Sequence, residues 1–194
     1  MLTLPQLPRY LQRRGGIQPD VAMAIFKYEN VIYRTAGELP AIGSYAPDVS
    51  LVNTKLQDVS LANWTGMRKV INIFVSIDTD VCAKSVIEFD RYAEGVDDVA
   101  MLMVSYDLPF AHGRFMKQHD LRNVIGLSAI RHAGFGENYG VQIMDGPLAG
   151  MFARAVVVMD ENNTVVHHEH IEDISTEPDY AAALRALGIK VDGD

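Results

Sequence analysis

The chain has 194 residues, of which 48% are hydrophobic and 22% charged, proportions that fit one globular domain with a full core. Its 25 acidic residues outnumber 17 basic ones, and the net charge of -8 disfavours nonspecific binding to nucleic acid or anionic membranes. A single cysteine excludes an intrachain disulfide, and the opening residues MLTLPQLPRYLQRR contain no apolar run of signal-peptide length. We therefore expect a cytoplasmic protein that binds neither nucleic acid nor membrane.

The N-terminal part predicts an extension followed by short β-structure. Residues 1–20 mix Pro, Gly and Arg without a period, and we interpret them as an extension to one domain over residues 21–194. Residues 22–34 predict a hairpin with Glu29 and Asn30 at its turn. Residues 43–66 predict short strands and turns that lead into the core.

The next segment predicts a strand, a helix and a second strand. KVINIFV at 69–75 and VAMLMVS at 99–105 have the apolar composition of buried strands. Apolar residues at helical spacing between them predict a helix over 79–95, with Asp78 or Thr79 as its N-cap. This order implies a right-handed parallel crossover.

The following elements continue the same alternation. Residues 108–120 predict a helix with Pro109 near its start. Residues 123–128 predict a strand and residues 131–140 a short helix. The glycines of the latter segment, GFGENYG, lack the spacing of a phosphate-binding loop.

The C-terminal part predicts a hairpin and a final helix. The hairpin covers 153–171 around DENN, and the helix covers 175–187, with Thr176 as its cap and Pro178 in its first turn. The whole order of elements is that of an α/β, thioredoxin-like fold, in which helices flank a central mixed sheet, here with an N-terminal hairpin.

Cys82 lies in the first turn of the helix predicted after the 69–75 strand. Helix N-termini carry partial positive charge and unpaired N–H groups, which stabilise a thiolate, the reactive form of cysteine. Junctions of this kind are where open α/β sheets place their sites. The competing interpretation is that Cys82 is simply a buried core residue, as free cysteines often are.

A family resemblance favours a catalytic role for Cys82 over that of a buried core residue. The segment SIDTDVCAKSVIEF at 76–89 resembles the active-site segment of the thiol peroxidase branch of the peroxiredoxins, whose pattern is Pro-Ser-x-Asp-Thr-x-x-Cys at a strand-to-helix junction. The resemblance covers about residues 40–187 and continues in separate, ordered segments, namely KVINIF, VSYDLPFAHGRF, NVIGLS, YGVQIMDGPLAGMFARAVVVMDENN and STEPDYAAALRAL.

The resemblance implies three site residues. Cys82 corresponds to the peroxidatic cysteine, Thr79 to a hydroxyl that hydrogen-bonds the thiolate and the peroxide, and Arg154 to the active-site arginine. The thiolate would attack one peroxide oxygen and become a sulfenic acid. Arg154 can reach Cys82 only if the strand that begins near it lies beside the 69–75 strand.

The chain departs from the family pattern at three positions. Val75 replaces the motif's proline, which restores a backbone N–H and predicts a looser pocket. Asp80 places a negative charge near the thiolate and opposes it. Met116 stands where the branch usually has a resolving cysteine, so an external thiol must reduce the sulfenic acid.

These residues predict a one-cysteine thiol peroxidase for hydrogen peroxide and organic hydroperoxides. The resemblance implies thioredoxin as the reductant, a homodimer, and no metal or organic cofactor. Because Met116 replaces the resolving cysteine, a small thiol such as glutathione is the alternative reductant. The three departures also leave open a non-catalytic or redox-sensing thioredoxin-fold protein.

The histidines suggest little further chemistry. HHEH at 167–170 would place His168 and His170 on one face of a strand, where a weak metal site competes with an ordinary solvated surface. We expect His112, His119 and His132 on surface helices or loops.

Overall fold

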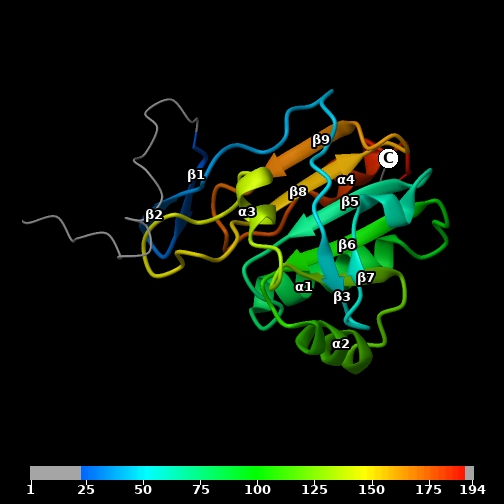
Figure 1. Cartoon of the computed structure of the whole chain (residues 1–194), viewed down its shortest axis with the longest axis horizontal. Helices are drawn as coiled ribbons and strands as arrows, with labels where there is room; N and C mark the ends of the chain where they lie inside the picture. The colour runs from blue at the N-terminus through cyan, green and yellow to red at the C-terminus, as the bar shows by residue number, and fades with distance from the viewer. Residues whose placement is uncertain (1–22, 191–194) are drawn as a thin grey trace, which may run out of the picture.

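The computed structural model describes residues 23–190 and contains a seven-stranded mixed sheet in the order β4-β3-β7-β6-β5-β8-β9 (Figure 1). The centre is parallel: β5 (Arg68–Ile73), β6 (Val99–Ser105) and β7 (Val124–Ser128). Antiparallel strands complete both edges: β8 (Ala155–Met159) and β9 (Val165–His170) on one side, β3 (Leu51–Asn53) and β4 (Asp58–Val59) on the other. The predicted thioredoxin-like architecture is confirmed.

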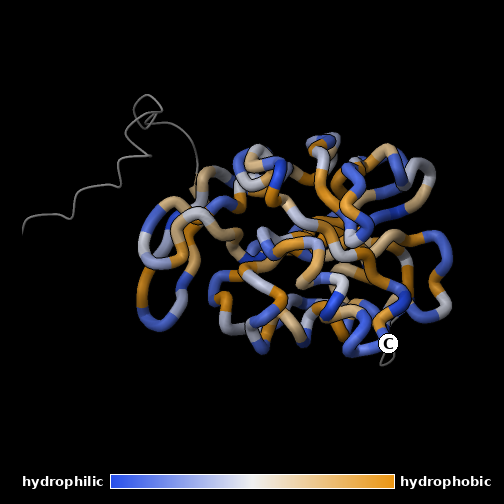
Figure 2. The backbone as a smooth tube through the Cα atoms, turned by 60° about the horizontal axis from the view of Figure 1, so that its bottom comes forward, coloured by the Kyte–Doolittle hydropathy of each residue, from blue (hydrophilic) through white to orange (hydrophobic). Residues whose placement is uncertain are grey.

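Each face of the sheet builds its own hydrophobic core, because side chains alternate along the strands. Met101 and Met103 of β6 face one core, which α1 (Asp80–Tyr92), α2 (Pro109–Gln118) and α4 (Tyr180–Arg185) cover. Leu102 and Val104 face the other core, covered by the loop segments, the 3-10 turn Leu61–Trp64 and α3 (Gly134–Asn138). Figure 2 shows hydrophobic stretches running through the middle of the molecule and hydrophilic ones at its outer turns.

The N-terminal hairpin is present as predicted and projects from one end of the molecule (Figure 1). It joins β1 (Ile25–Tyr28) to β2 (Val31–Arg34) through Glu29 and Asn30, whose φ angles are 47° and 64°. Two positive φ values at the centre of a two-residue loop match the twist of the strands. The extension predicted over residues 1–20 lies outside the described residues.

Backbone hydrogen bonds join the hairpin to the segment after β9. Lys27 N donates to Glu172 O at 2.7 Å, and Ile174 N donates to Lys27 O at 3.1 Å. Lys27 thus forms a parallel bridge with Asp173. The hairpin and residues 172–174 are therefore one structural unit.

The start of the final helix differs from the prediction. The helix begins at Tyr180, and its N-cap is Asp179, whose carboxylate accepts from Ala182 N. Thr176 is not the cap, because its hydroxyl and its N–H both bond the Asp173 carbonyl in a separate turn. Pro178 consequently precedes the helix. No helix among residues 23–190 is both long and apolar enough to span a bilayer.

Candidate active site

Cys82 lies where β5 ends and α1 begins, at the floor of a pocket of about 460 Å³. Its side chain is 0% exposed to solvent and packs into the core beneath α1. Residues from four separate parts of the chain line the pocket: Tyr28, Val75, Asp78, Thr79, Asp80, Val81, Cys82, Leu148, Arg154, Ile174 and Ser175. Cys82 is therefore buried and is at the same time one of the residues that line the pocket.

Arg154 reaches Cys82 through strand pairing. β5 and β8 are antiparallel neighbours, with Ile73 opposite Ala155, so the residue just before β8 lies beside the carboxyl end of β5. The Nη2 of Arg154 donates to Cys82 Sγ at 3.2 Å. The strand arrangement required by the sequence analysis is confirmed, and it brings a permanent cation to the sulfur.

The Arg154 guanidinium is anchored on its other side by a carbonyl. Its Nε and Nη2 donate to Ile174 O at 3.1 and 3.0 Å. The arginine is only 2% exposed, and its buried Nη1 has no hydrogen-bond partner among residues 23–190. Buried donors are normally paired, so this nitrogen is available for an acceptor that enters the pocket.

Thr79 is the N-cap residue of α1 by backbone conformation, but its side chain caps nothing. Its hydroxyl instead donates to Ser76 O at 3.0 Å. A hydroxyl whose hydrogen is used in this way keeps its lone pairs and can accept a hydrogen bond from a ligand. Thr79 and Cys82 line the same pocket, so all three residues named from the family pattern lie around it.

The three departures from the family pattern lie in different places. Val75 is half-buried in the pocket wall, and Asp80 is exposed at the same pocket. Met116 is half-buried on α2 and packs against the core that contains Cys82. Cys82 has no second thiol anywhere in the sequence to form a disulfide with.

The prediction that His112 lies on the surface is wrong. Its side chain is 1% exposed, because Pro109, His112 and Phe115 form the buried face of α2. Gly126 of β7 makes room for the ring, since a Cβ there would lie 2.8 Å from His112 Cβ. Burial lowers the pKa of His112 from 6.5 to about 4, so the ring is neutral near pH 7.

The histidines of β9 are half-buried along the strand. His168 and His170 share a face of the strand, opposite Val157 and Ala155, and His168 Nδ1 lies 2.9 Å from Pro40 O. Within the described part of the chain, no group of three or more His, Cys, Asp or Glu side chains is placed to hold an ion. The strand is half-buried rather than fully solvated.

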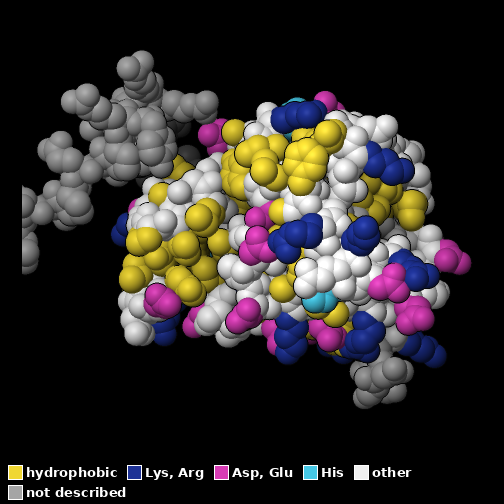
Figure 3. Space-filling model, turned by 90° about the horizontal axis from the view of Figure 1, so that it is seen from below, with side chains coloured by type: hydrophobic (Ala, Val, Ile, Leu, Met, Phe, Trp, Pro, Cys, Tyr) yellow, Lys and Arg dark blue, Asp and Glu magenta, His cyan; other side chains and the backbone are white. Residues whose placement is uncertain are grey.

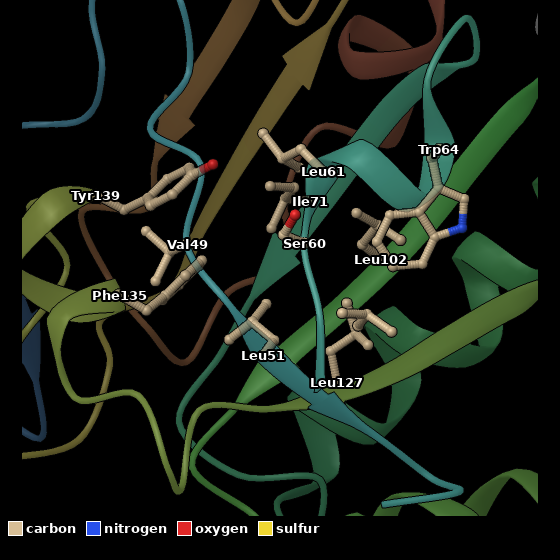
Figure 4. A pocket seen from close by; sticks show the side chains of 11 residues that line it. Val49, Leu51, Ser60, Leu61, Trp64, Ile71, Leu102, Leu127, Phe135 and Tyr139 are labelled. Carbon is tan, nitrogen blue, oxygen red and sulfur yellow. The ribbon is translucent and has the colours of Figure 1, made fainter. Parts of the chain in front are cut away.

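A second and much smaller pocket lies on the opposite face of the sheet from Cys82 (Figure 4). It has a volume of about 10 Å³, close to the space one water requires. The side chains around it are mostly apolar and belong to the other core, with Trp64 and Tyr139 at its sides. It is a packing gap and is too small for a substrate.

Comparisons of the sequence and the structure with known proteins identify the family of this chain. Residues 41–184 match the Redoxin family. A thiol peroxidase of Corynebacterium glutamicum is 46% identical over 153 residues, and one of Mycobacterium bovis is 47% identical over 154 residues; each alignment covers 79% of this chain and 92% of the relative. The crystal structure of a peroxiredoxin-like protein from Aquifex aeolicus superposes with a TM-score of 0.80 at 30% identity, over 86% of this chain and 98% of that one.

Proposed function

This chain belongs to the redoxin family, in its thiol peroxidase branch, and from that membership we propose that it is a one-cysteine thiol peroxidase. Cys82 is the peroxidatic residue, Arg154 stabilises its thiolate and activates the peroxide, and Thr79 orients the peroxide. The substrates are hydrogen peroxide and organic hydroperoxides. The reductant is an external thiol.

The observation that carries the proposal is the geometry of Arg154. One guanidinium nitrogen donates to Cys82 Sγ, and another is buried without a hydrogen-bond partner in the described part of the chain. The first stabilises negative charge on the sulfur, and the second can donate to a peroxide oxygen. Donors fixed in advance at the atoms where charge develops stabilise the transition state most effectively.

The first half-reaction follows from these contacts. The thiolate attacks the terminal oxygen of ROOH, an S–O bond forms, and the O–O bond breaks. The sulfur loses two electrons and becomes Cys–SOH, while the departing alkoxide takes up a proton and leaves as ROH. Arg154 lies beside the sulfur and can stabilise the charge that develops on both oxygens.

The pocket walls favour organic hydroperoxides as well as hydrogen peroxide. Tyr28, Val75, Leu148 and Ile174 supply apolar surface around the opening to Cys82. An alkyl group bound there leaves water, which lowers the free energy of the complex. Hydrogen peroxide has no alkyl group, so the polar side chains of the pocket, Thr79 and Arg154, are sufficient to bind it.

The second half-reaction requires thiols from outside the chain. A first thiol R′SH attacks the sulfenic acid, releases water and leaves a mixed disulfide Cys–S–SR′; a second thiol then releases R′SSR′ and restores Cys82. Thioredoxin and a small thiol such as glutathione are the two candidates for the reductant. The reaction needs no metal or organic cofactor.

We also propose a homodimer, as the family resemblance implies. Leu108 and Phe110, at the start of α2, are 52% and 66% exposed. Figure 3 views the molecule from the side of α2 and shows hydrophobic side chains gathered in separate areas of its surface. Sedimentation of the purified chain tests this proposal, and a monomer at micromolar concentration would contradict it.

A single-turnover oxidation tests the proposed activity. Reduced protein is mixed with one equivalent of a hydroperoxide, Cys82 is trapped with a sulfenic-acid reagent, and the mass is measured. We expect one adduct per chain, none in Cys82→Ser, and continuous peroxide consumption once thioredoxin or glutathione is added. Trapping without turnover by any thiol would favour a redox sensor. An intact thiol in excess peroxide would show a non-catalytic fold.

Thr79→Val should slow the oxidation of Cys82 about tenfold, the cost of one lost hydrogen bond to the peroxide. Valine keeps the shape of the side chain and removes only the hydroxyl. Thr79→Ser is the matched control, because it restores the hydroxyl, and we expect it to react within about twofold of the native rate. A native rate in Thr79→Val would remove the hydroxyl from the mechanism. Stopped-flow mixing with hydroperoxide measures both rates.

Asp80→Asn should accelerate the oxidation of Cys82 about two- to fivefold, because it removes an exposed negative charge from the pocket that Cys82 also lines. The gain should shrink in high salt, which screens exposed charges. The same change at Asp97, also exposed but outside the pocket, is the control and should leave the rate unchanged. A slower reaction in Asp80→Asn would mean that the carboxylate helps rather than opposes the chemistry.

A further inference from the structure

A half-buried carboxylate, that of Asp107, holds the turn that precedes Cys82. Asp107 follows β6, yet its Oδ1 accepts from Ser76 Oγ at 2.8 Å and its Oδ2 accepts from Ile77 N at 2.6 Å. Oδ2 also accepts from Ser105 Oγ at 2.7 Å. One side chain therefore joins the ends of two neighbouring parallel strands, β5 and β6.

The hydrogens in this cluster have one consistent arrangement. Ser105 Oγ donates its single hydrogen to Asp107, accepts from Asp107 N at 3.1 Å, and lies 3.0 Å from His112 Nε2. Because the hydroxyl hydrogen is already used, His112 Nε2 must carry a hydrogen and donate it. Ser105 and His112 are 0% and 1% exposed, so solvent does not compete for these bonds.

The cluster is not a Ser-His-Asp catalytic triad, although it contains the same three residue types. In a triad, histidine lies between the serine and the aspartate and takes the serine proton. Here Ser105 lies between Asp107 and His112 and donates to the carboxylate. No member of the cluster lines the pocket that contains Cys82.

Hydrogen bonds of Ser76 connect the cluster to Thr79, which lines the pocket. Ser76, which donates to Asp107, accepts from Asp78 N through its hydroxyl at 3.2 Å and from Thr79 Oγ1 through its carbonyl at 3.0 Å. Ser76 O also accepts from Thr79 N at 3.2 Å. The orientation of the Thr79 hydroxyl, and with it the first turn of α1, therefore depends on a turn that Asp107 fixes at its other end.

We propose that Asp107 is a positioning residue for the peroxide reaction. It acts through Ser76 to hold Thr79 and the first turn of α1 in the correct orientation relative to Arg154. This inference rests on the proposed peroxidase function. Asp107 does not touch the reacting atoms, so its effect is confined to how well the groups around Cys82 are oriented. Small errors in the orientation of such groups reduce the reaction rate strongly.

Asp107→Ala tests this role against a merely structural one. Asp90→Ala is the matched control, because Asp90 is also half-buried and also accepts backbone hydrogen bonds, in its case from the N–H groups of Arg122 and Asn123, at the other end of α1. Two rates are measured for each variant: oxidation of Cys82 by hydroperoxide, and alkylation of Cys82 by iodoacetamide. Alkylation requires the thiolate but no oriented peroxide, so the ratio of the two rates reports positioning alone.

We expect the ratio to fall about tenfold in Asp107→Ala and to stay within about twofold of native in Asp90→Ala, with melting temperatures measured alongside. Asp107→Asn keeps an oxygen for Ile77 N–H and should restore most of the ratio. Adding Ser76→Ala to Asp107→Ala should cause no further loss, because the two act as one unit. If Asp107→Ala does not fold, Ser76→Ala alone carries the same test.

The outcomes separate this inference from the proposed function. A native ratio in Asp107→Ala, or in Ser76→Ala where that variant is used, would overturn the positioning role and leave the peroxidase intact. An equal fall in Asp90→Ala would also overturn it, since the loss would then be general. Failure of the native chain to react with peroxide would overturn both.

Discussion

Arg154→Met should slow the oxidation of Cys82 by hydroperoxide about 10²- to 10³-fold, the usual cost of a lost donor to developing charge. Methionine fills a similar volume but removes the Nη2 contact to Cys82 Sγ and also Nη1, which has no hydrogen-bond partner within residues 23–190. It also removes the buried positive charge that lies beside the sulfur. Stopped-flow mixing with hydroperoxide measures the rate.

Arg154→Lys separates charge from geometry. A lysine keeps the positive charge but cannot donate to the sulfur, to Ile174 O and to a peroxide from one planar group. We expect a rate between those of the native chain and Arg154→Met. Thermal unfolding of both variants controls for loss of the Ile174 anchor. A rate within about threefold of native in folded Arg154→Met would exclude the arginine from the mechanism.

Acid should destabilise the fold through His112 by about 3 kcal/mol between pH 6.5 and 4. Burial lowers the pKa of His112 from its ordinary 6.5 to about 4 in the folded chain. The unfolded chain therefore binds a proton below pH 6.5, whereas the folded chain does not until the pH approaches 4. Stability is fully present above pH 6.5 and is lost as the pH falls through this window.

Urea unfolding across this pH range measures the effect. His112→Asn cannot titrate there, so its free energy of unfolding should fall less steeply with decreasing pH than that of the native chain, whatever its absolute stability. His119→Asn is the control, because His119 is exposed at the end of the same helix, and it should keep the native slope. Equal slopes in His112→Asn and the native chain would contradict the buried, neutral histidine.

The sequence predicted the elements whose apolar pattern is long and regular. The strands at 69–75 and 99–105, the helix that contains Cys82 and the hairpin around Glu29 and Asn30 all appear where the pattern places them. The final helix began later than predicted, because Thr176 forms a local turn with Asp173 that competes with capping. Local hydrogen bonds of this kind leave no clear pattern in the sequence.

The placement of the site was predictable only in part. Family resemblance named Cys82, Thr79 and Arg154, and strand pairing brings the first and last together. The Ile174 carbonyl that anchors Arg154 could not be predicted, because every residue has a backbone carbonyl and only the fold selects this one. His112 was misplaced for a different reason: the glycine that accommodates it, Gly126, lies on another element.

The bridge between the hairpin and residues 172–174 bears on how the protein is made. The anchor for Arg154 is Ile174, and Ile174 is held by Lys27, so contacts 147 positions apart in the sequence (174 minus 27) complete the site. Chains emerge from the ribosome N-terminus first, at about 5–20 residues per second. A nascent chain therefore presents Cys82 before Ile174, the anchor of Arg154, has been synthesised. We expect the proposed activation of Cys82 by Arg154 to begin only when synthesis is nearly complete.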